Sequence, residues 1–301
     1  MKTQKLLTSA TIAALITSAY GSVTIDWVTV GNPGNAADPL TGYGAVAYEY
    51  KIGKYEVTNA QYVEFLNAKG KTNNSLGGYT LFDGSNTNII RSGISGSYTY
   101  SVTAALANRP VVSVSWYEAA QFANWMMNGQ GNADMETGAY DLNAYPNYWL
   151  MPFTDAKFRL PTEDEWYKAA YYNGANSTYS LHANGQNSIT TADANYASSG
   201  STDVGAFSGD ASSYGTFDQG GNVWEWNDAK ILWVNSNNRG LRGGSWYESE
   251  VFLESSFRSS GASGNQRNDL VGFRLVAVVP EPSAMLLSML ASGLMLIRRK
   301  R

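Results

Sequence analysis

The sequence predicts an α+β domain with little regular secondary structure. Three short segments combine a helix start signal with apolar residues at spacings of three and four. The rest of the chain reads as short strands and long loops, and its 301 residues include 9 Trp and 20 Tyr. A few helices around small sheets, with aromatic side chains filling the core, would produce this pattern.

The first expected helix begins at Thr58 or Asn59, because either side chain can accept a hydrogen bond from the first turn. Tyr62, Phe65 and Leu66 then share one face of the helix. We expect that face to be buried.

The other two helices each begin with a capping box. Ser115 is followed three residues later by Glu118, and Thr162 is followed by Glu165. The apolar stripes consist of Ala119, Phe122, Ala123 and Met126 in the second helix and of Trp166, Ala169 and Ala170 in the third.

Two long segments, 69–101 and 173–213, are rich in Gly, Asn, Ser and Thr and show little periodic apolar pattern. Their backbone polar groups nevertheless need partners. We expect side-chain hydrogen bonds, a ligand or ions to order most of these two segments.

Residues 1–21 have the pattern of a secretory signal peptide. Lys2 and Lys5 precede a mostly apolar run over 6–16, and small residues stand just before Ser22, the expected first residue after cleavage. A membrane anchor is the alternative, but the run is shorter than the ~20 residues that a spanning helix needs. We therefore expect export.

The other end of the chain, 279–301, contains Pro280-Glu281-Pro282, an apolar stretch over 284–297 and a final basic cluster, Arg298-Arg299-Lys300-Arg301. This order resembles the PEP-CTERM sorting tail that exosortase machinery recognises in Gram-negative bacteria. A plain tail anchor is the alternative, since in both cases the basic cluster stays cytoplasmic. The resemblance implies delivery to the cell surface, the outer membrane or the extracellular space.

The body between these ends, 22–278, has the length of one sizeable domain. It retains 15 of the 21 bases and 24 of the 25 acids, which gives a net charge near −9. Nucleic acid and anionic membranes both require a basic surface, so neither is an expected partner. The chain contains no Cys, which excludes disulfides and thiol chemistry.

Five sequence motifs stand out in this body. In chain order they are Tyr55-Glu56-Val57-Thr58-Asn59-Ala60-Gln61-Tyr62; Pro110-Val111 with Val114-Ser115-Trp116; Arg159-Leu160-Pro161-Thr162-Glu163 with Glu165-Trp166; Gly221-Asn222-Val223-Trp224-Glu225-Trp226; and Arg242-Gly243-Gly244-Ser245-Trp246 with Arg258 and Gly272-Phe273-Arg274. Their order and spacing over 55–276 closely resemble the formylglycine-generating enzyme, or sulfatase-modifying factor, family. The resemblance implies a variant of the C-type-lectin fold.

Active members of that family hold Cu(I) with two cysteines shortly after the Gly-Gly-Ser motif, and they use O2 to oxidise a substrate cysteine. The matching positions here are Glu248 and Leu253. Neither side chain offers the soft thiolate that Cu(I) selects, so we expect no copper and no oxidase activity. Trp224 and Ser245 match residues of the family's oxygen pocket, and their alternative roles are a core aromatic and a turn hydroxyl.

The same resemblance implies a calcium site. Its ligands would be the side chains of Asp218 and Glu225 and the carbonyl groups of Gly221 and Val223. Hard oxygen donors on a Gly-containing loop suit Ca²⁺. The alternative makes Asp218 a turn residue and Glu225 a buried hydrogen-bond acceptor. A second family site keeps only Asn195, and we do not expect that site.

Other catalytic classes find little support in the sequence. A related branch, the ergothioneine-type sulfoxide synthases, holds iron with several histidines, but His182 is the single His in this chain. A Ser-His-Asp triad would also need His182, and nothing in the sequence places a nucleophile beside it. A paired-carboxylate hydrolase stays open, although no pair of acids is marked by its spacing.

The sequence therefore predicts a non-catalytic binding or structural module at the cell surface, a pseudoenzyme of its family. Its acidic, aromatic and loop-rich body would recognise a surface glycan, an exopolysaccharide or a protein. The sorting machinery would be a further partner through the tail. The alternatives are an enzyme that uses residues other than cysteine, and a purely structural matrix component.

Overall fold

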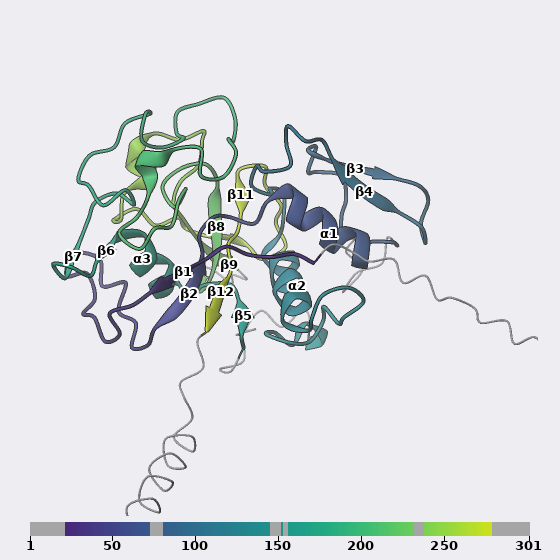
Figure 1. Ribbon diagram of the computed structural model, residues 1–301, viewed down its shortest axis with the longest axis horizontal. Coiled ribbons are helices and arrows are strands. Elements are labelled where there is room, and N and C mark those ends of the chain that lie inside the picture. Colours follow the sequence, from purple (N-terminus) through teal and green to yellow (C-terminus); the bar gives the residue numbers. More distant parts are fainter. Residues whose placement is uncertain (1–21, 73–80, 145–151, 153–155, 232–237, 279–301) are drawn as a thin grey trace, which may run out of the picture.

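The computed structural model describes residues 22–72, 81–144, 152, 156–231 and 238–278 (Figure 1). Its α-helices are α1 (Asn59–Lys69), α2 (Trp116–Met127) and α3 (Glu163–Tyr171), and its 3-10 helices are η2 (Leu142–Ala144), η3 (Ser208–Asp210) and η4 (Glu250–Leu253). The expected signal peptide and sorting tail lie outside the described residues. Among the described residues, no helix is both long enough and apolar enough to span a membrane.

All three α-helices begin as the sequence predicts. Thr58, rather than Asn59, caps α1, and Gln61 completes a capping box there that the sequence analysis missed. The two predicted boxes, at Ser115 and at Thr162, are both present. The predicted apolar stripes of all three helices are buried.

Two four-stranded sheets form the centre of the domain. The first has the order β1-β2-β12-β5, and all of its pairings are antiparallel. Its strands are β1 (Trp27–Val30), β2 (Tyr50–Gly53), β12 (Val276–Val278) and β5 (Phe158–Arg159). The last described strand of the chain thus lies between β2 and β5, inside the sheet.

The second sheet has the order β10-β9-β8-β11. Its strands are β10 (Ala262–Ser263), β9 (Asn238–Arg242), β8 (Trp224–Ile231) and β11 (Val271–Gly272). β8 pairs with β9 antiparallel and with β11 parallel, which places Trp224 opposite Val271. The Gly-Asn-Val-Trp-Glu-Trp motif thereby enters a central strand.

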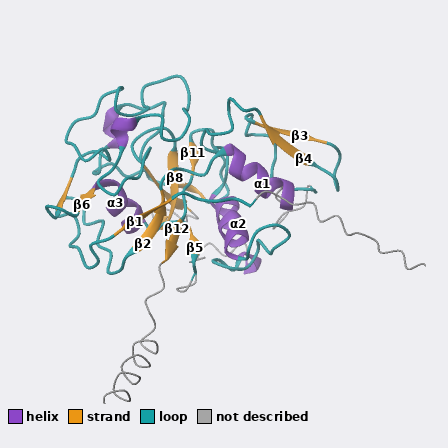
Figure 2. Cartoon of the chain, viewed as in Figure 1, coloured by secondary structure: helices purple, strands orange, loops and turns teal. Residues whose placement is uncertain are grey.

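Two small hairpins lie in or beside the segments expected to be loops. They are β3 (Ile89–Ser92) with β4 (Thr99–Val102), and β6 (Tyr172–Asn173) with β7 (Thr178–Tyr179). Most of the remaining chain is loop, as Figure 2 shows. Side-chain hydrogen bonds order parts of it, as expected; for example, Asp193 accepts hydrogen bonds from the backbone and hydroxyl of Thr190.

The main core is aromatic and lies between α1, α2 and the second sheet. Tyr62 stacks on Phe122 with 5.9 Å between ring centroids, and Phe65 meets Phe122 edge to face at 5.5 Å. Phe273, from the Gly-Phe-Arg motif, also contacts Phe122 at 5.5 Å. This packing, together with the small sheets and extensive loops, confirms the expected α+β class with low regular secondary structure.

A buried carboxyl group on β8 makes stability depend on pH. The Tyr140 hydroxyl lies 3.0 and 2.9 Å from the two oxygens of Asp228 and is hydrogen-bonded to this carboxyl group, and burial raises the pKa of Asp228 from 3.8 to about 7. The folded protein therefore keeps the Asp228 carboxyl group protonated up to a higher pH than the unfolded chain does. Its stabilising contribution is complete below about pH 4 and is lost as the pH rises through 7.

We expect Asp228→Asn to remove this loss, because the amide oxygen still accepts from Tyr140 and carries no charge. Between pH 4 and 8, the free energy of unfolding of the unmodified protein should fall by up to about 4 kcal/mol more than that of the variant. Urea denaturation across this range measures the difference. The exposed control Asp26→Asn should leave the pH profile unchanged. Parallel profiles for Asp228→Asn and the unmodified protein would contradict the argument.

Candidate functional site

Three of the residues singled out in the sequence meet in one hydrogen-bonded cluster. Trp224 donates its indole N–H to Oε1 of Glu248 at 3.0 Å. The backbone N–H of Ser245 donates to Oε2 of Glu248 at 3.1 Å, and the Ser245 hydroxyl donates to the same oxygen. The Glu248 carboxylate thus accepts three hydrogen bonds and is fixed in place.

This cluster adjoins a cleft of about 350 Å³. The cleft is lined by Trp224, Trp226, Leu241, Glu248, Phe252, Phe257, Ser259, Ser260, Gly261, Ala262, Gln266, Asn268, Leu270 and Val271. These residues come from β8, β9, β10, β11, η4 and the loops between them. Glu248 is the single charged residue among the described residues that line it.

The two positions that match the family's cysteines lie in different surroundings. Glu248 lines the cleft, whereas Leu253 is fully buried in a separate apolar cluster with Ile189, Ala194 and Tyr196. In the η4 turn it is the neighbouring Phe252 that lines the cleft. The structure therefore brings Glu248, but not Leu253, together with Trp224 and Ser245.

Ser245 and Trp224 both have structural contacts: Ser245 is a turn hydroxyl and Trp224 is a core aromatic, the alternative roles given in the sequence analysis. Ser245 is fully buried, and its hydroxyl also accepts a hydrogen bond from the Tyr247 backbone at 3.3 Å, as a turn residue does. Trp224 is 8% exposed and packs against Phe252 and Phe257, so it serves the core and the cleft wall together.

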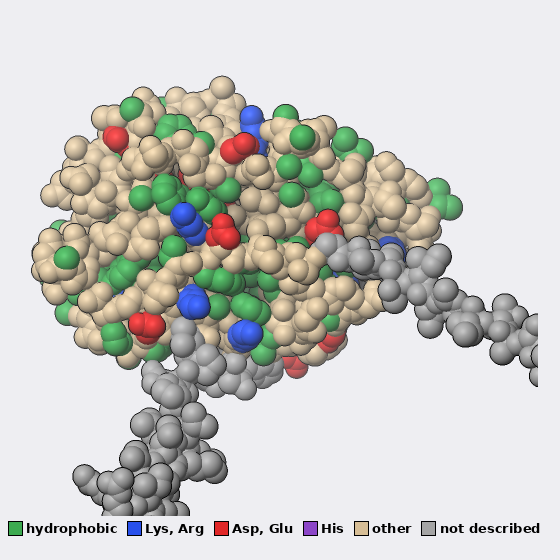
Figure 3. All heavy atoms as spheres, in the orientation of Figure 1, with side chains coloured by type: hydrophobic (Ala, Val, Ile, Leu, Met, Phe, Trp, Pro, Cys, Tyr) green, Lys and Arg blue, Asp and Glu red, His purple; other side chains and the backbone are tan. Residues whose placement is uncertain are grey.

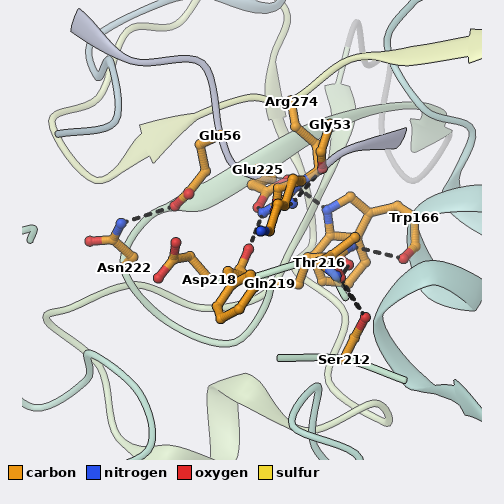
Figure 4. Close-up of polar contacts among 12 residues, drawn as sticks. Gly53, Glu56, Trp166, Ser212, Thr216, Asp218, Gln219, Asn222, Glu225 and Arg274 are labelled. Atoms are coloured by element: carbon orange, nitrogen blue, oxygen red, sulfur yellow. Dashed lines mark hydrogen bonds and ion pairs between the residues drawn. The ribbon is translucent and has the colours of Figure 1, made fainter. Parts of the chain in front are cut away.

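The residues expected to hold calcium lie in a second, buried cluster (Figure 4). Glu225 is fully buried and forms a two-pronged ion pair with Arg274, with both contacts at 2.6 Å. The indole N–H of Trp166 donates to the same carboxylate at 2.8 Å. Arg274 also donates to the carbonyl oxygens of Gly53 at 3.0 Å and Phe217 at 2.8 Å.

Asp218 faces Glu56 rather than Glu225, as Figure 4 shows. Oδ2 of Asp218 accepts the Gly205 backbone N–H at 2.6 Å, and Oε1 of Glu56 accepts the Asn222 side-chain amide at 3.0 Å. Burial raises the pKa of Asp218 to about 6 and, together with the charge of Asp218, raises the pKa of Glu56 well above its usual range. These shifts suit one proton shared between the two carboxyl groups.

The other two expected calcium positions lie in tightly packed backbone. Gly221 has a φ of +94°, and a Cβ atom there would lie 2.4 Å from the Asn195 carbonyl oxygen, so this position requires glycine. Val223 is fully buried. At the start of the second family site, the Asn195 side-chain amide donates hydrogen bonds to Asn222 and Gly200.

This donor set does not fit a cation between Asp218 and Glu225. Both oxygens of Glu225 are already bonded to a guanidinium group, which supplies the compensating charge that calcium would have supplied. Glu225 therefore has the alternative role of a buried acceptor. Calcium binding itself stays a prediction.

Several residues of the site were not expected from the sequence. Phe252 and Phe257 follow the Gly-Gly-Ser motif closely, so a run of aromatic residues was the available signal. Glu56 stands in the first motif, but nothing in its spacing indicates that it meets Asp218, which is 162 residues away in the sequence. His182 is buried and is not among the residues that line the cleft.

Similarity to known proteins covers most of the chain. The family of the sulfatase-modifying factor enzyme 1-like domain matches residues 14–279. Hercynine oxygenase from Mycobacterium tuberculosis is 26% identical over 237 residues, which are 70% of this chain and 48% of that protein. The chain thus spans about half the length of that curated relative.

Two solved structures share the fold. Variable protein 1 of Treponema denticola superposes with a TM-score of 0.58 at 24% identity, covering 87% of this chain and 98% of that one. CarF superposes with a TM-score of 0.59 at 21% identity, covering 85% and 99%. These two likenesses show the fold, and the match over 14–279 establishes that the chain belongs to the family of the sulfatase-modifying factor enzyme 1-like, or formylglycine-generating enzyme-like, domain.

Proposed function

We propose that this protein is an exported binding module that keeps the family's fold but not its oxidation chemistry. The observation that carries the proposal is the cluster of Glu248, Ser245 and Trp224 beside the cleft. A carboxylate held by three hydrogen bonds occupies a position where active relatives place a copper-binding thiolate. A fixed, charged group in a partly apolar cleft suits recognition of a ligand.

The surface supports a binding role. The part visible in Figure 3 is mostly neutral, with acidic and basic side chains scattered singly among polar and apolar ones. A surface glycan, an exopolysaccharide or a protein segment would meet few charged groups on such a face. The 350 Å³ cleft has the size of a small-ligand site.

The direct test of lost catalysis uses a sulfatase-type peptide that contains a cysteine. Incubated with Cu(I) and O2, the purified protein should yield no formylglycine by mass spectrometry, whereas an active family member run in parallel should convert the peptide. Conversion by this protein would overturn the proposal. Binding of the same protein to exopolysaccharide and cell-wall glycans, with and without calcium, tests both the ligand class and the calcium prediction.

The proposed location rests on the two ends of the sequence. Lys2, Lys5 and the apolar run over 6–16 support signal-peptide cleavage before Ser22, and the motif Pro280-Glu281-Pro282 supports sorting through a PEP-CTERM tail. N-terminal sequencing of protein recovered from the cell envelope should begin at Ser22. Retention of Met1 in the cytoplasmic fraction would contradict export.

An enzyme is the second candidate, and the similarity to hercynine oxygenase is the observation that favours it. Such an activity would use the oxygen and nitrogen groups of the cleft, because the chain has no Cys. O2 consumption with added iron or copper and a thiol substrate measures it. Consumption that Glu248→Gln abolishes would favour this candidate over a binding module.

A further inference from the structure

We propose that one face of the first sheet binds an acidic polysaccharide, at a surface separate from the cleft. The strand register defines this face. Trp27 on β1 stands opposite Gly53 on β2. On β5, Phe158 stands opposite Ala277. Ala277 also stands opposite Lys51, which is two residues before Gly53. Opposite residues, and residues two apart on a strand, point to the same side of a sheet, so all five share one face.

The two sides of the sheet differ in what covers them. On the other side, Ile52 and Val276 pack with Ala169 of α3, and all three are fully buried. On the proposed binding side, the two aromatic rings are half-buried and Lys51 is exposed. In Figure 3, basic side chains lie among hydrophobic ones over β2 and β5. The side chains of this open face that a ligand would contact are those of Trp27, Thr29, Lys51, Lys157 and Phe158.

The aromatic rings of the open face are held in place by the fold. Trp27 and Phe158 stack with 5.7 Å between ring centroids and 13° between ring planes. Gly53 and Ala277, which stand opposite them, have no bulky side chain to keep the rings apart. Both rings also pack against the main core. Such fixed rings offer apolar contact area at a small entropic cost.

Two amines bring positive charge to the open face. Lys157 Nζ lies 5.1 Å from the centroid of the Phe158 ring, so its charge is beside the aromatic pair. Lys51 extends from β2 with an exposed side chain. Within the described residues, neither amine belongs to an ion pair. The face therefore attracts an anion locally, although the body as a whole has a net charge near −9.

The combination of rings, amines and a hydroxyl group favours a sugar acid. The apolar face of a sugar ring can lie against the aromatic pair, while its carboxylate meets an amine and its hydroxyl groups meet Thr29. A bilayer suits this face less well, because half-buried rings cannot insert and an anionic plane would also meet the acids of the body. A nucleic acid requires more cations than two. A single polysaccharide chain needs to contact this face alone.

The experiment compares polygalacturonate with its fully methyl-esterified form, which keeps the sugar chain but removes its charges. Titration calorimetry on the purified protein should show the acid binding at least roughly tenfold more tightly than the ester. Binding of the acid should weaken several-fold between about 0.01 and about 1 M NaCl, because the Debye length falls from ~30 to ~3 Å. Dextran sulfate separates two sources of charge: if it also binds, the face accepts anionic sugars in general, and if it does not, the face selects carboxylates.

The two lysines are exposed, so they can be changed without disturbing the core. Lys51→Gln and Lys157→Gln should each weaken polygalacturonate about threefold, and the double variant should weaken it roughly tenfold. Phe158→Leu keeps an apolar side chain but removes the ring, and should weaken binding several-fold. Lys71→Gln changes an exposed lysine that follows α1, and this matched control should bind normally. Thermal unfolding checks that each variant is folded.

Glu248→Gln separates this face from the cleft and should bind polygalacturonate normally. A loss of binding in that variant would place the polysaccharide in the cleft and refute a second surface. Equal affinity for the acid and its ester, or normal binding by the double lysine variant, would refute it as well. Binding to phosphatidylglycerol vesicles without binding to polygalacturonate would assign the face to a membrane instead. None of these results bears on the oxidation chemistry, which the formylglycine assay tests separately.

Discussion

Arg274→Met should destabilise this domain by about 3–5 kcal/mol, the largest effect that we expect from a single substitution. Arg274 is fully buried, pairs through two contacts with the equally buried Glu225, and lies near the carboxyl groups of Glu56 and Asp218. Without the guanidinium, the Glu225 carboxylate and three backbone carbonyls lose a hydrogen-bond partner inside the protein, and Glu56 and Asp218 lose a nearby positive charge.

Chemical denaturation measures the effect, and Arg274→Lys separates charge from geometry. Lysine restores one positive charge but not the planar fork, so it should recover a part of the loss. The exposed Lys51→Met on β2 is the control and should change stability by less than about 0.5 kcal/mol. A loss below about 1 kcal/mol for Arg274→Met would show that water or a bound cation compensates the acids.

Leu253→Ala should cost about 2–5 kcal/mol, because Leu253 is fully buried and the substitution leaves a cavity. Its side chain packs over the backbone of the Gly-Gly-Ser turn: a Cβ atom at Gly244 would lie 2.7 Å from Leu253 Cδ1. Position 253 thus supports the loop that carries Ser245.

Val251→Ala is the matched control, since Val251 lies in the same η4 turn and is 49% exposed. We expect it to change the free energy of unfolding by less than about 0.5 kcal/mol. Thermal or urea unfolding of the two variants gives the comparison. Equal effects would mean that the turn, and not the Leu253 side chain, carries the stability.

Much of the fold could be predicted because short sequence signals mark where its helices begin. Ser115 with Glu118 and Thr162 with Glu165 fix two helix starts by a hydrogen-bond exchange within four residues. The sheets could not be delimited in the same way. A strand such as β11 has two residues, and its position is set by pairing with Trp224 far away in the sequence.

The candidate site was predictable where motif spacing places residues on one turn, as for Ser245 and Glu248. The site was not predictable where the burial of a side chain moves it away from the place that motif spacing indicates. Leu253 matches a family cysteine by counting, but an apolar side chain is drawn toward Ile189 and Tyr196, and Phe252 lines the cleft in its place. Likewise, Glu225 meets Arg274 across 49 residues, a partner that the loop composition alone does not reveal.

The position of β12 inside the first sheet has a mechanical consequence. A pull applied at Val278 acts on a strand that is hydrogen-bonded on both sides, to β2 and to β5, rather than on a peripheral segment. Load entering at that end is shared between two strands that belong to distant parts of the chain. A protein held by its C-terminal end would therefore resist shear through the centre of this sheet before the load reaches β11, the cleft strand that directly precedes β12 in the chain.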